Sequence, residues 1–345
     1  MKVMRKLFLI FPSVLIMTGA SIAQETLGSV PSEFDQTKGT KHLVVVWNDS
    51  TASVEEADEA AVEVERVYGL ISDYLGRDRV PGSKIIVILE GAMFAEGQRR
   101  IPWVDWEGRV HLFRSPGPTG EYLSIFPHEL VHALRAEQPN RKATLAKTGG
   151  RFLEEGFAEA VALIAEGGIN RYPYWGTEPD VVVWHLMSSK LDIALEALIE
   201  HHDELSLKCE LQSYPLRGSF FRFLEKKVGR EKLLELAYRQ GPFGIEVYEK
   251  AAGTKFAALV DEWRGEIEAR SKSIPEILEK GKAWQTMVEG FGLRLCRPGE
   301  ESAAETCGLT ITPARNRLPN TCSTLGLSPP DLRRTNGRKV RTSVA

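Results

Sequence analysis

The sequence lacks an excess of positive charge, since 44 lysines and arginines stand against 47 aspartates and glutamates and the net charge is −3. A protein that binds nucleic acid through its phosphates needs a basic surface, so this balance argues against a nucleic-acid partner. Four cysteines in 345 residues are too few for a disulfide scaffold. The 43% hydrophobic and 26% charged residues are ordinary globular values, which exclude a disordered, collagen-like or polytopic membrane protein.

The N-terminus has the features of a secretory signal peptide. Its first six residues carry three positive charges, residues 7–17 are apolar, and Ser21 and Ala23 are the small residues that precede a cleavage site. The apolar stretch is short for a bilayer span. We therefore predict a signal peptide at residues 1–23, export to the periplasm or the medium, and no stable membrane insertion of the mature chain. The alternative is an uncleaved N-terminal anchor.

Hydrophobic periodicity predicts two subdomains after the signal. Residues 42–150 mix strands and helices, whereas residues 151–270 have helical period almost throughout. The expected strands are residues 42–47, 84–89 and 109–113. The expected helices are residues 54–75, 121–137, 151–166, 181–199, 220–227, 231–239 and 256–267. Asp49, Ser50 and Thr51 are candidate caps for the first of these helices.

A C-terminal extension at residues 285–345 differs in composition. Residues 311–345 contain seven basic residues, one acid and four prolines. Such a segment buries little apolar surface, so we expect a poorly ordered, solvated end. The alternative is that it folds back on the acidic body of the protein.

The four cysteines can form disulfides in an oxidising compartment. One possible arrangement pairs Cys296 with Cys307 and Cys209 with Cys322. Four cysteines allow three pairings, and the sequence does not choose among them. No two of them lie close together in the sequence, which argues against a separate zinc site.

The strongest functional signal is the motif His128-Glu129-Leu130-Val131-His132. Two histidines four residues apart lie one turn apart on the same face of a helix, so both imidazoles can reach one Zn²⁺. The intervening Glu129 is then placed to activate a zinc-bound water. Pro127 must lie in the first turn of this helix or kink it.

A second segment, Phe152 to Glu159, offers the third metal ligand. We predict Glu155 as that ligand, because a catalytic zinc usually has three protein ligands and Gly156 lets two helices approach closely. Glu159 lies one turn further on and is predicted to accept a hydrogen bond from the outer nitrogen of a ligating histidine. Glu154 is expected to point elsewhere, toward solvent.

A third histidine soon after the motif would be an alternative ligand. Arg135 stands where that pattern has glycine, and Gln138 stands where it has histidine. This alternative therefore fails.

These segments resemble the gluzincin metallopeptidases, specifically the bacterial peptidase MA-like group. The resemblance rests on residues 128–132 and 153–159, on Tyr214-Pro-Leu-Arg-Gly-Ser-Phe and on Leu259-Val-Asp-Glu-Trp263. It implies that His128, His132 and Glu155 bind zinc and that Glu129 is the general base. It also implies that residues 109–113 form the edge strand along which a peptide substrate lies.

The same resemblance suggests a residue that stabilises the oxyanion. Similar enzymes place a tyrosine or histidine of the helical half opposite the zinc, and Tyr214 is the candidate here, with Arg217 in reserve. The alternative is a tyrosine packed in the core. His201 and His202 are expected to be solvated.

Together these features predict an α+β, zincin-like fold in which a small mixed sheet and the metal helix precede a helical subdomain. The predicted function is exported, zinc-dependent hydrolysis of peptide bonds in a peptide or protein substrate. Two alternatives from other classes stay open. One is a zinc-bound but catalytically inactive envelope-binding module, and the other is a scaffold without metal.

Overall fold

The protein is described by a computed structural model. It covers residues 26–27, 30–95, 98–114, 122–136, 145, 149–167, 173–202, 205, 208–239, 241, 243–290 and 293–297. The predicted signal peptide, Cys307, Cys322 and the basic tail lie outside the described residues. All described residues belong to one compact unit. Within the described part, no helix has the length and apolarity needed to cross a membrane.

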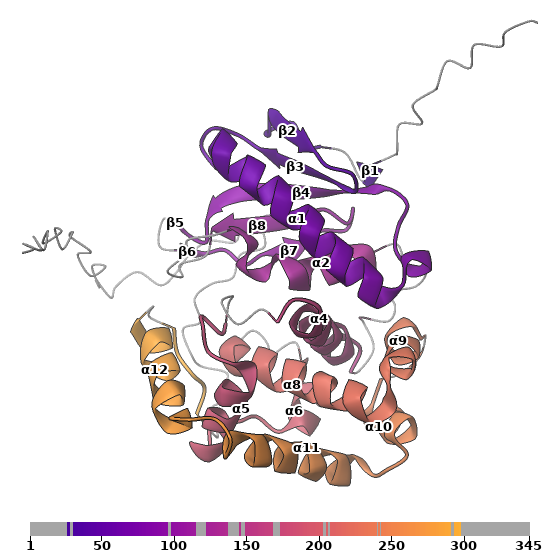
Figure 1. The fold of residues 1–345 in the computed structure, drawn as a ribbon, viewed down its shortest axis with the longest axis vertical. Coiled ribbons are helices and arrows are strands. Elements are labelled where there is room, and N and C mark those ends of the chain that lie inside the picture. The colour runs from indigo at the N-terminus through magenta and orange to yellow at the C-terminus, as the bar shows by residue number, and fades with distance from the viewer. Residues whose placement is uncertain are drawn as a thin grey trace, which may run out of the picture. The chain divides into compact units, whose positions relative to one another are not determined.

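A six-stranded mixed sheet forms the first half of the fold (Figure 1). Its strands are Thr26–Leu27 (β1), Gln36–Gly39 (β2), Leu43–Trp47 (β3), Lys84–Ala92 (β4), Trp103–Val104 (β7) and Val110–Arg114 (β8). The order is β2-β3-β4-β8-β7, with β1 also paired to β4; β3, β4 and β8 are parallel, and β2 and β7 pair antiparallel at the two ends. Phe94–Ala95 (β5) and Gln98–Arg99 (β6) form a separate two-stranded sheet.

The central strands are apolar along their length, and both faces of the sheet are buried in hydrophobic clusters. Val45, Val87 and Leu112 belong to the main core, which includes the helix Val54–Leu75 (α1), while Ile86 and Phe34 belong to a smaller cluster. Buried parallel strands need such continuous hydrophobic runs. Figure 1 shows α1 lying along the sheet.

Helix α1 has the bounds expected from its periodicity, but a different cap. Ser53 accepts a hydrogen bond from the backbone of Glu56, and the side chain of Glu56 accepts one from the backbone of Ser53. This reciprocal capping box satisfies two amide groups at the start of the helix. The expected cap at Asp49, Ser50 or Thr51 is therefore wrong.

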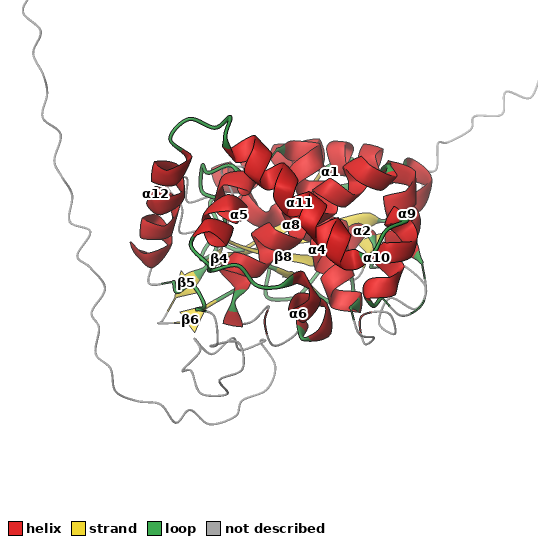
Figure 2. Cartoon of the chain, turned by 90° about the horizontal axis from the view of Figure 1, so that it is seen from below, coloured by secondary structure: helices red, strands yellow, loops and turns green. Residues whose placement is uncertain are grey.

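The second half of the described chain is helical, which makes the architecture α+β. Its helices lie together below the sheet in Figure 1 and in front of it in Figure 2. They are Gly150–Glu166 (α4), Pro179–Ser188 (α5), Leu195–Glu200 (α6), Glu210–Val228 (α8), Arg230–Tyr238 (α9), Ile245–Ala252 (α10), Phe256–Ser271 (α11) and Ile277–Gly290 (α12). The predicted extension from residue 285 thus begins inside α12.

The helices differ from the sequence prediction in several places. The helix expected at residues 121–137 is replaced by a 3₁₀ turn at Tyr122–Ile125 and a shorter helix, Phe126–Leu134, and α10 and α12 were not among the expected helices. The helix expected at residues 181–199 is broken, because α5 ends at Ser188 and Lys190 adopts the left-handed conformation at φ 56° before α6 begins. Helix α8 begins at Glu210, ten residues earlier than expected, and contains Pro215. A proline inside a helix removes one backbone hydrogen bond. Local periodicity therefore did not predict that the helix continues through Pro215.

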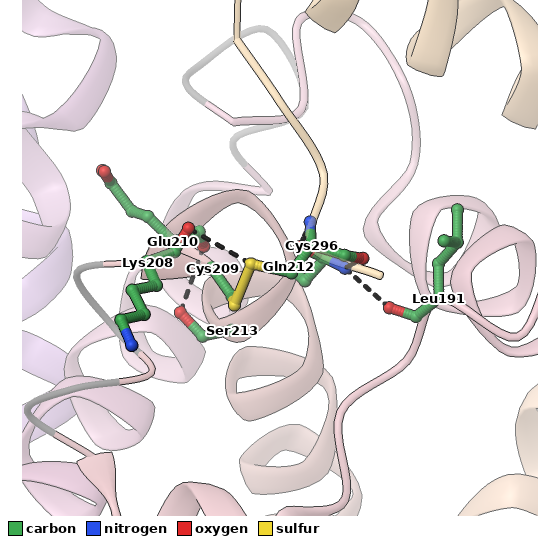
Figure 3. The surroundings of a disulfide bond; sticks show 7 residues. All are labelled: Leu191, Lys208, Cys209, Glu210, Gln212, Ser213 and Cys296. Atoms are coloured by element: carbon green, nitrogen blue, oxygen red, sulfur yellow. Dashed lines mark hydrogen bonds between the residues drawn. A yellow bond between two sulfur atoms is a disulfide. The ribbon is translucent and has the colours of Figure 1, made fainter. Parts of the chain in front are cut away.

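A disulfide joins Cys209, at the start of α8, to Cys296 (Figure 3). The buried side chain of Gln212 reinforces it by accepting a hydrogen bond from the backbone N–H of Cys296 and donating one to its carbonyl, both at 2.8 Å. The same amide donates to the carbonyl of Leu191 at 2.7 Å. The segment around Cys296 is therefore fixed to α8, and the suggested arrangement, Cys296 with Cys307 and Cys209 with Cys322, is wrong.

Replacing Cys209 and Cys296 together by serine is expected to lower the free energy of unfolding by about 2–5 kcal/mol. The bond closes a loop with a sequence separation of 87 residues, so its loss frees a long stretch of the unfolded chain. Urea unfolding of the oxidised protein and the variant measures the difference. Reductant should lower the midpoint of the wild type but not of the variant. Equal midpoints for the oxidised wild type and the variant would contradict the expectation.

Candidate metal centre

Helix Phe126–Leu134 (α2) presents both histidines of the motif. It follows a short 3₁₀ turn, and Pro127 lies in its first turn, where a missing amide hydrogen costs nothing. His128 and His132 are buried, and their Nε2 atoms lie 3.0 Å apart. Because the motif spacing is one helical turn, both imidazoles leave the same face of α2.

Helix α4 packs against α2 and supplies Glu155. One carboxylate oxygen, Oε2, lies 3.2 Å from Nε2 of His128 and 3.6 Å from Nε2 of His132. The three side chains form a group that can hold a metal ion. Glu155 is 23% exposed while both histidines are buried, so the group opens to solvent on the side of Glu155.

The outer nitrogen of His128 is held by Glu159. Its Nδ1 lies 2.9 Å from Oε2 of Glu159, and the other oxygen of Glu159 accepts a hydrogen bond of 2.6 Å from the hydroxyl of Tyr174. A carboxylate at Nδ1 places the proton there and leaves the lone pair of Nε2 for a metal. Glu159 thus orients His128, and Tyr174, which the sequence analysis did not single out, fixes Glu159.

Glu154 performs the same task for His132, and its expected exposure to solvent is wrong. It is 3% exposed, and its Oε1 lies 3.0 Å from Nδ1 of His132. Its Oε2 pairs with Arg135 at 2.7 Å, which balances the buried charge. His132 and Arg135 lie at the end of α2, whereas Glu154 lies on α4. The arrangement therefore depends on how α2 crosses α4. Glu154 and Glu155 therefore both face the site. Glu154 contacts Nδ1 of His132, and Glu155 contacts Nε2 of both histidines.

The donor set fits a cation. With both Nδ1 atoms donating to carboxylates, Nε2 of each neutral imidazole is left to bind an ion beside Glu155; without an ion, a proton on Nε2 of His128 takes that place and is donated to Glu155. Burial alone would lower the pKa of His128, but its hydrogen bonds to Glu155 and Glu159 raise that pKa to about 10. Burial would raise the pKa of Glu155, but the two histidines hold it well below its usual range. The group therefore favours positive charge. Ligands about 2.0–2.2 Å from a shared tetrahedral ion lie about 3.3–3.6 Å apart, and the separations of 3.0, 3.2 and 3.6 Å here are close to that range.

Glu129 is buried on α2, directly after His128 in the sequence. Burial lowers the pKa of His128, and its hydrogen bonds to Glu155 and Glu159 raise it. The negative charge of Glu129 makes a smaller contribution that also raises this pKa. Its charge acts on Tyr214 as well, adding to the larger effects of burial and Glu155, which raise the phenol pKa well above its ordinary value. Glu129 therefore lies within electrostatic reach of both residues.

Tyr214 comes to the site from α8. Its ring meets the ring of His128 edge-on, with centroids 5.3 Å apart and an interplanar angle of 62°. Tyr214 is half-buried. The helical half thus brings this phenol next to the histidine that Glu159 orients.

Close contact between α4 and α8 sets these positions. A Cβ atom on Gly156 would lie 2.5 Å from the ring of Phe221, and a Cβ on Gly218 would lie 2.5 Å from Cγ of Glu159. Each glycine therefore makes room for the other helix. The expectation that Gly156 admits the metal helix is wrong, because its partner is α8.

Two further expectations are corrected. Strand β8 is not an edge strand, because β7 pairs with it at Val110 and His111 and forms the end of the sheet. His202 is buried and hydrogen-bonded to Arg217, whereas His201 is exposed as expected.

Comparisons of the chain with protein-family models, with curated proteins and with solved structures give no match.

Proposed function

We propose that this protein is a zinc-dependent metallopeptidase of the gluzincin type with a zincin-like fold. The observation that carries the proposal is the convergence of two imidazole nitrogens and one carboxylate, with the outer nitrogen of each histidine held by a further carboxylate. Oriented ligands of this kind are typical of catalytic metal sites. The resemblance of the sequence to the bacterial peptidase MA-like group supports the same class.

Zinc is the metal that we propose. Two histidines and one glutamate are a set that catalytic Zn²⁺ uses, with a fourth position left open. The partial exposure of Glu155 supports an open position on the side of solvent. Bound there, zinc would polarise a scissile carbonyl and lower the pKa of a water.

The protein's own residues supply the remaining chemistry. Glu129 accepts a proton from the attacking water and delivers it to the leaving amine. Tyr214 donates a hydrogen bond to the carbonyl oxygen as negative charge develops on it. Its contact with His128 supports this placement.

An inactive zinc-bound envelope-binding module is the second candidate. It would use the same three ligands, which are common to both functions. The presence of Glu129, buried next to those ligands, favours the enzyme, because a binding module has no use for a general base.

Zinc stoichiometry combined with an unbiased peptide-library digest tests the proposal. We expect about one zinc per chain and cleavage that a chelator abolishes and added zinc restores. Zinc without cleavage would favour the binding module. Protein that neither retains nor takes up zinc would refute the metal centre.

Replacing Tyr214 by phenylalanine is expected to lower kcat by roughly 10²- to 10³-fold, because one donor to the developing oxyanion is lost. The ring and its contact with His128 remain, so zinc content should not change. Steady-state kinetics with a peptide that the wild type cleaves gives the rate. A variant as fast as the wild type would remove Tyr214 from the mechanism.

A further inference from the structure

Arg217 is a buried positive charge beside Tyr214. It lies three residues further along α8, and its guanidinium carbon is 4.6 Å from the centroid of the Tyr214 ring. A cation over an aromatic face is attracted by the ring electrons, most strongly where water is excluded. Arg217 is 0% exposed, so it cannot touch a substrate and cannot itself be an oxyanion donor.

His202 holds Arg217 from the other end. Nη1 of Arg217 donates a hydrogen bond to Nε2 of His202, which is also buried. Burial, and then the charge of Arg217, lower the pKa of His202 to about 3. His202 is therefore neutral near pH 7 and accepts this hydrogen bond.

The helix lacks one backbone hydrogen bond next to Tyr214. Pro215 follows it directly and cannot donate a hydrogen bond to the carbonyl of Leu211. Side-chain contacts therefore carry more of the task of placing the phenol. Two of those contacts are with His128 and Arg217.

We propose that Arg217 is a positioning residue that holds the ring of Tyr214 beside His128, and that it affects peptide hydrolysis only through Tyr214. The kinetic part rests on the proposed function. The structural part, the placement of the ring, does not depend on it.

A double-mutant cycle tests the kinetic part. Arg217→Met is expected to lower kcat by about 10- to 100-fold, as a misplaced catalytic group does, while KM and zinc content hardly change. In the Tyr214→Phe background, the same substitution should change kcat by no more than about twofold, because the group it positions is already absent. Equal losses in both backgrounds, or a loss that appears in KM, would overturn the proposal.

Arg222→Met is the matched control. Arg222 lies on the same helix but pairs with Asp180, away from Tyr214. It should leave kcat unchanged. If Arg217→Met does not fold, Arg217→Lys enters the same cycle, since lysine keeps the charge but not the planar group that lies over the ring.

A crystal structure of metal-loaded Arg217→Met tests the structural part. We expect the Tyr214 ring to leave the edge of His128. A ring that stays in place would overturn the proposal, whether or not the wild type hydrolyses peptides. Absence of cleavage by the metal-loaded wild type would instead refute the proposed function, and the position of the ring would still decide the role of Arg217.

Discussion

Replacing Glu129 by glutamine is expected to lower turnover by about 10²- to 10⁴-fold and to leave the metal in place. Glutamine has nearly the same shape as glutamate, but its amide cannot accept the proton of the attacking water. Glu129 is not one of the three residues that form the metal-binding group, so the group itself is unchanged. Metal analysis of the purified variant, alongside kinetics on a peptide that the wild type cleaves, gives both quantities.

The metal content and the turnover of Glu129→Gln test different roles of Glu129. Wild-type rates in Glu129→Gln would reject the general-base role. Loss of zinc together with activity would show instead that Glu129 supports the metal site. Glu59→Gln on the exposed part of α1 is a control for the same chemical change far from any proposed role.

Replacing Glu155 by alanine is expected to have the largest effect on metal affinity of any single glutamate in α4. It leaves two histidines, which are too few to hold Zn²⁺ tightly. Glu154→Ala and Glu159→Ala should each weaken binding by about 10- to 100-fold, because each removes the carboxylate that orients one histidine. Competition with a chelator of known affinity ranks the three variants.

The three-way comparison also separates ligand from supporting residue. If Glu154→Ala or Glu159→Ala loses more zinc than Glu155→Ala, the assignment of the third ligand is wrong. If Glu154→Ala has no effect, its hydrogen bond to His132 does not matter for the metal. Glu154→Ala also leaves buried Arg135 without this ion pair, so its folding should be checked by thermal unfolding.

The placement of the two motif histidines follows from local sequence. A spacing of four residues in an apolar helix puts both imidazoles on one face, whatever the rest of the chain does. Local sequence also predicted α1, at Val54–Leu75, and an apolar strand at residues 84–89, which is the first part of the observed strand Lys84–Ala92. Each of these features is encoded within one or a few turns of chain.

Only the tertiary structure decided what surrounds the ligands. Whether Glu154 faces solvent or His132 depends on the crossing of α2 and α4. The ion pair with Arg135 at that crossing offsets the cost of burying the Glu154 carboxylate. The pairing of Cys209 with Cys296 and the contact of Arg217 with Tyr214 and His202 likewise join separate parts of the fold. Sequence periodicity reports which side of one element is apolar, but it carries no information about which element covers that side. The sequence by itself therefore determined that the two motif histidines share one helix face, and packing determined how they are oriented.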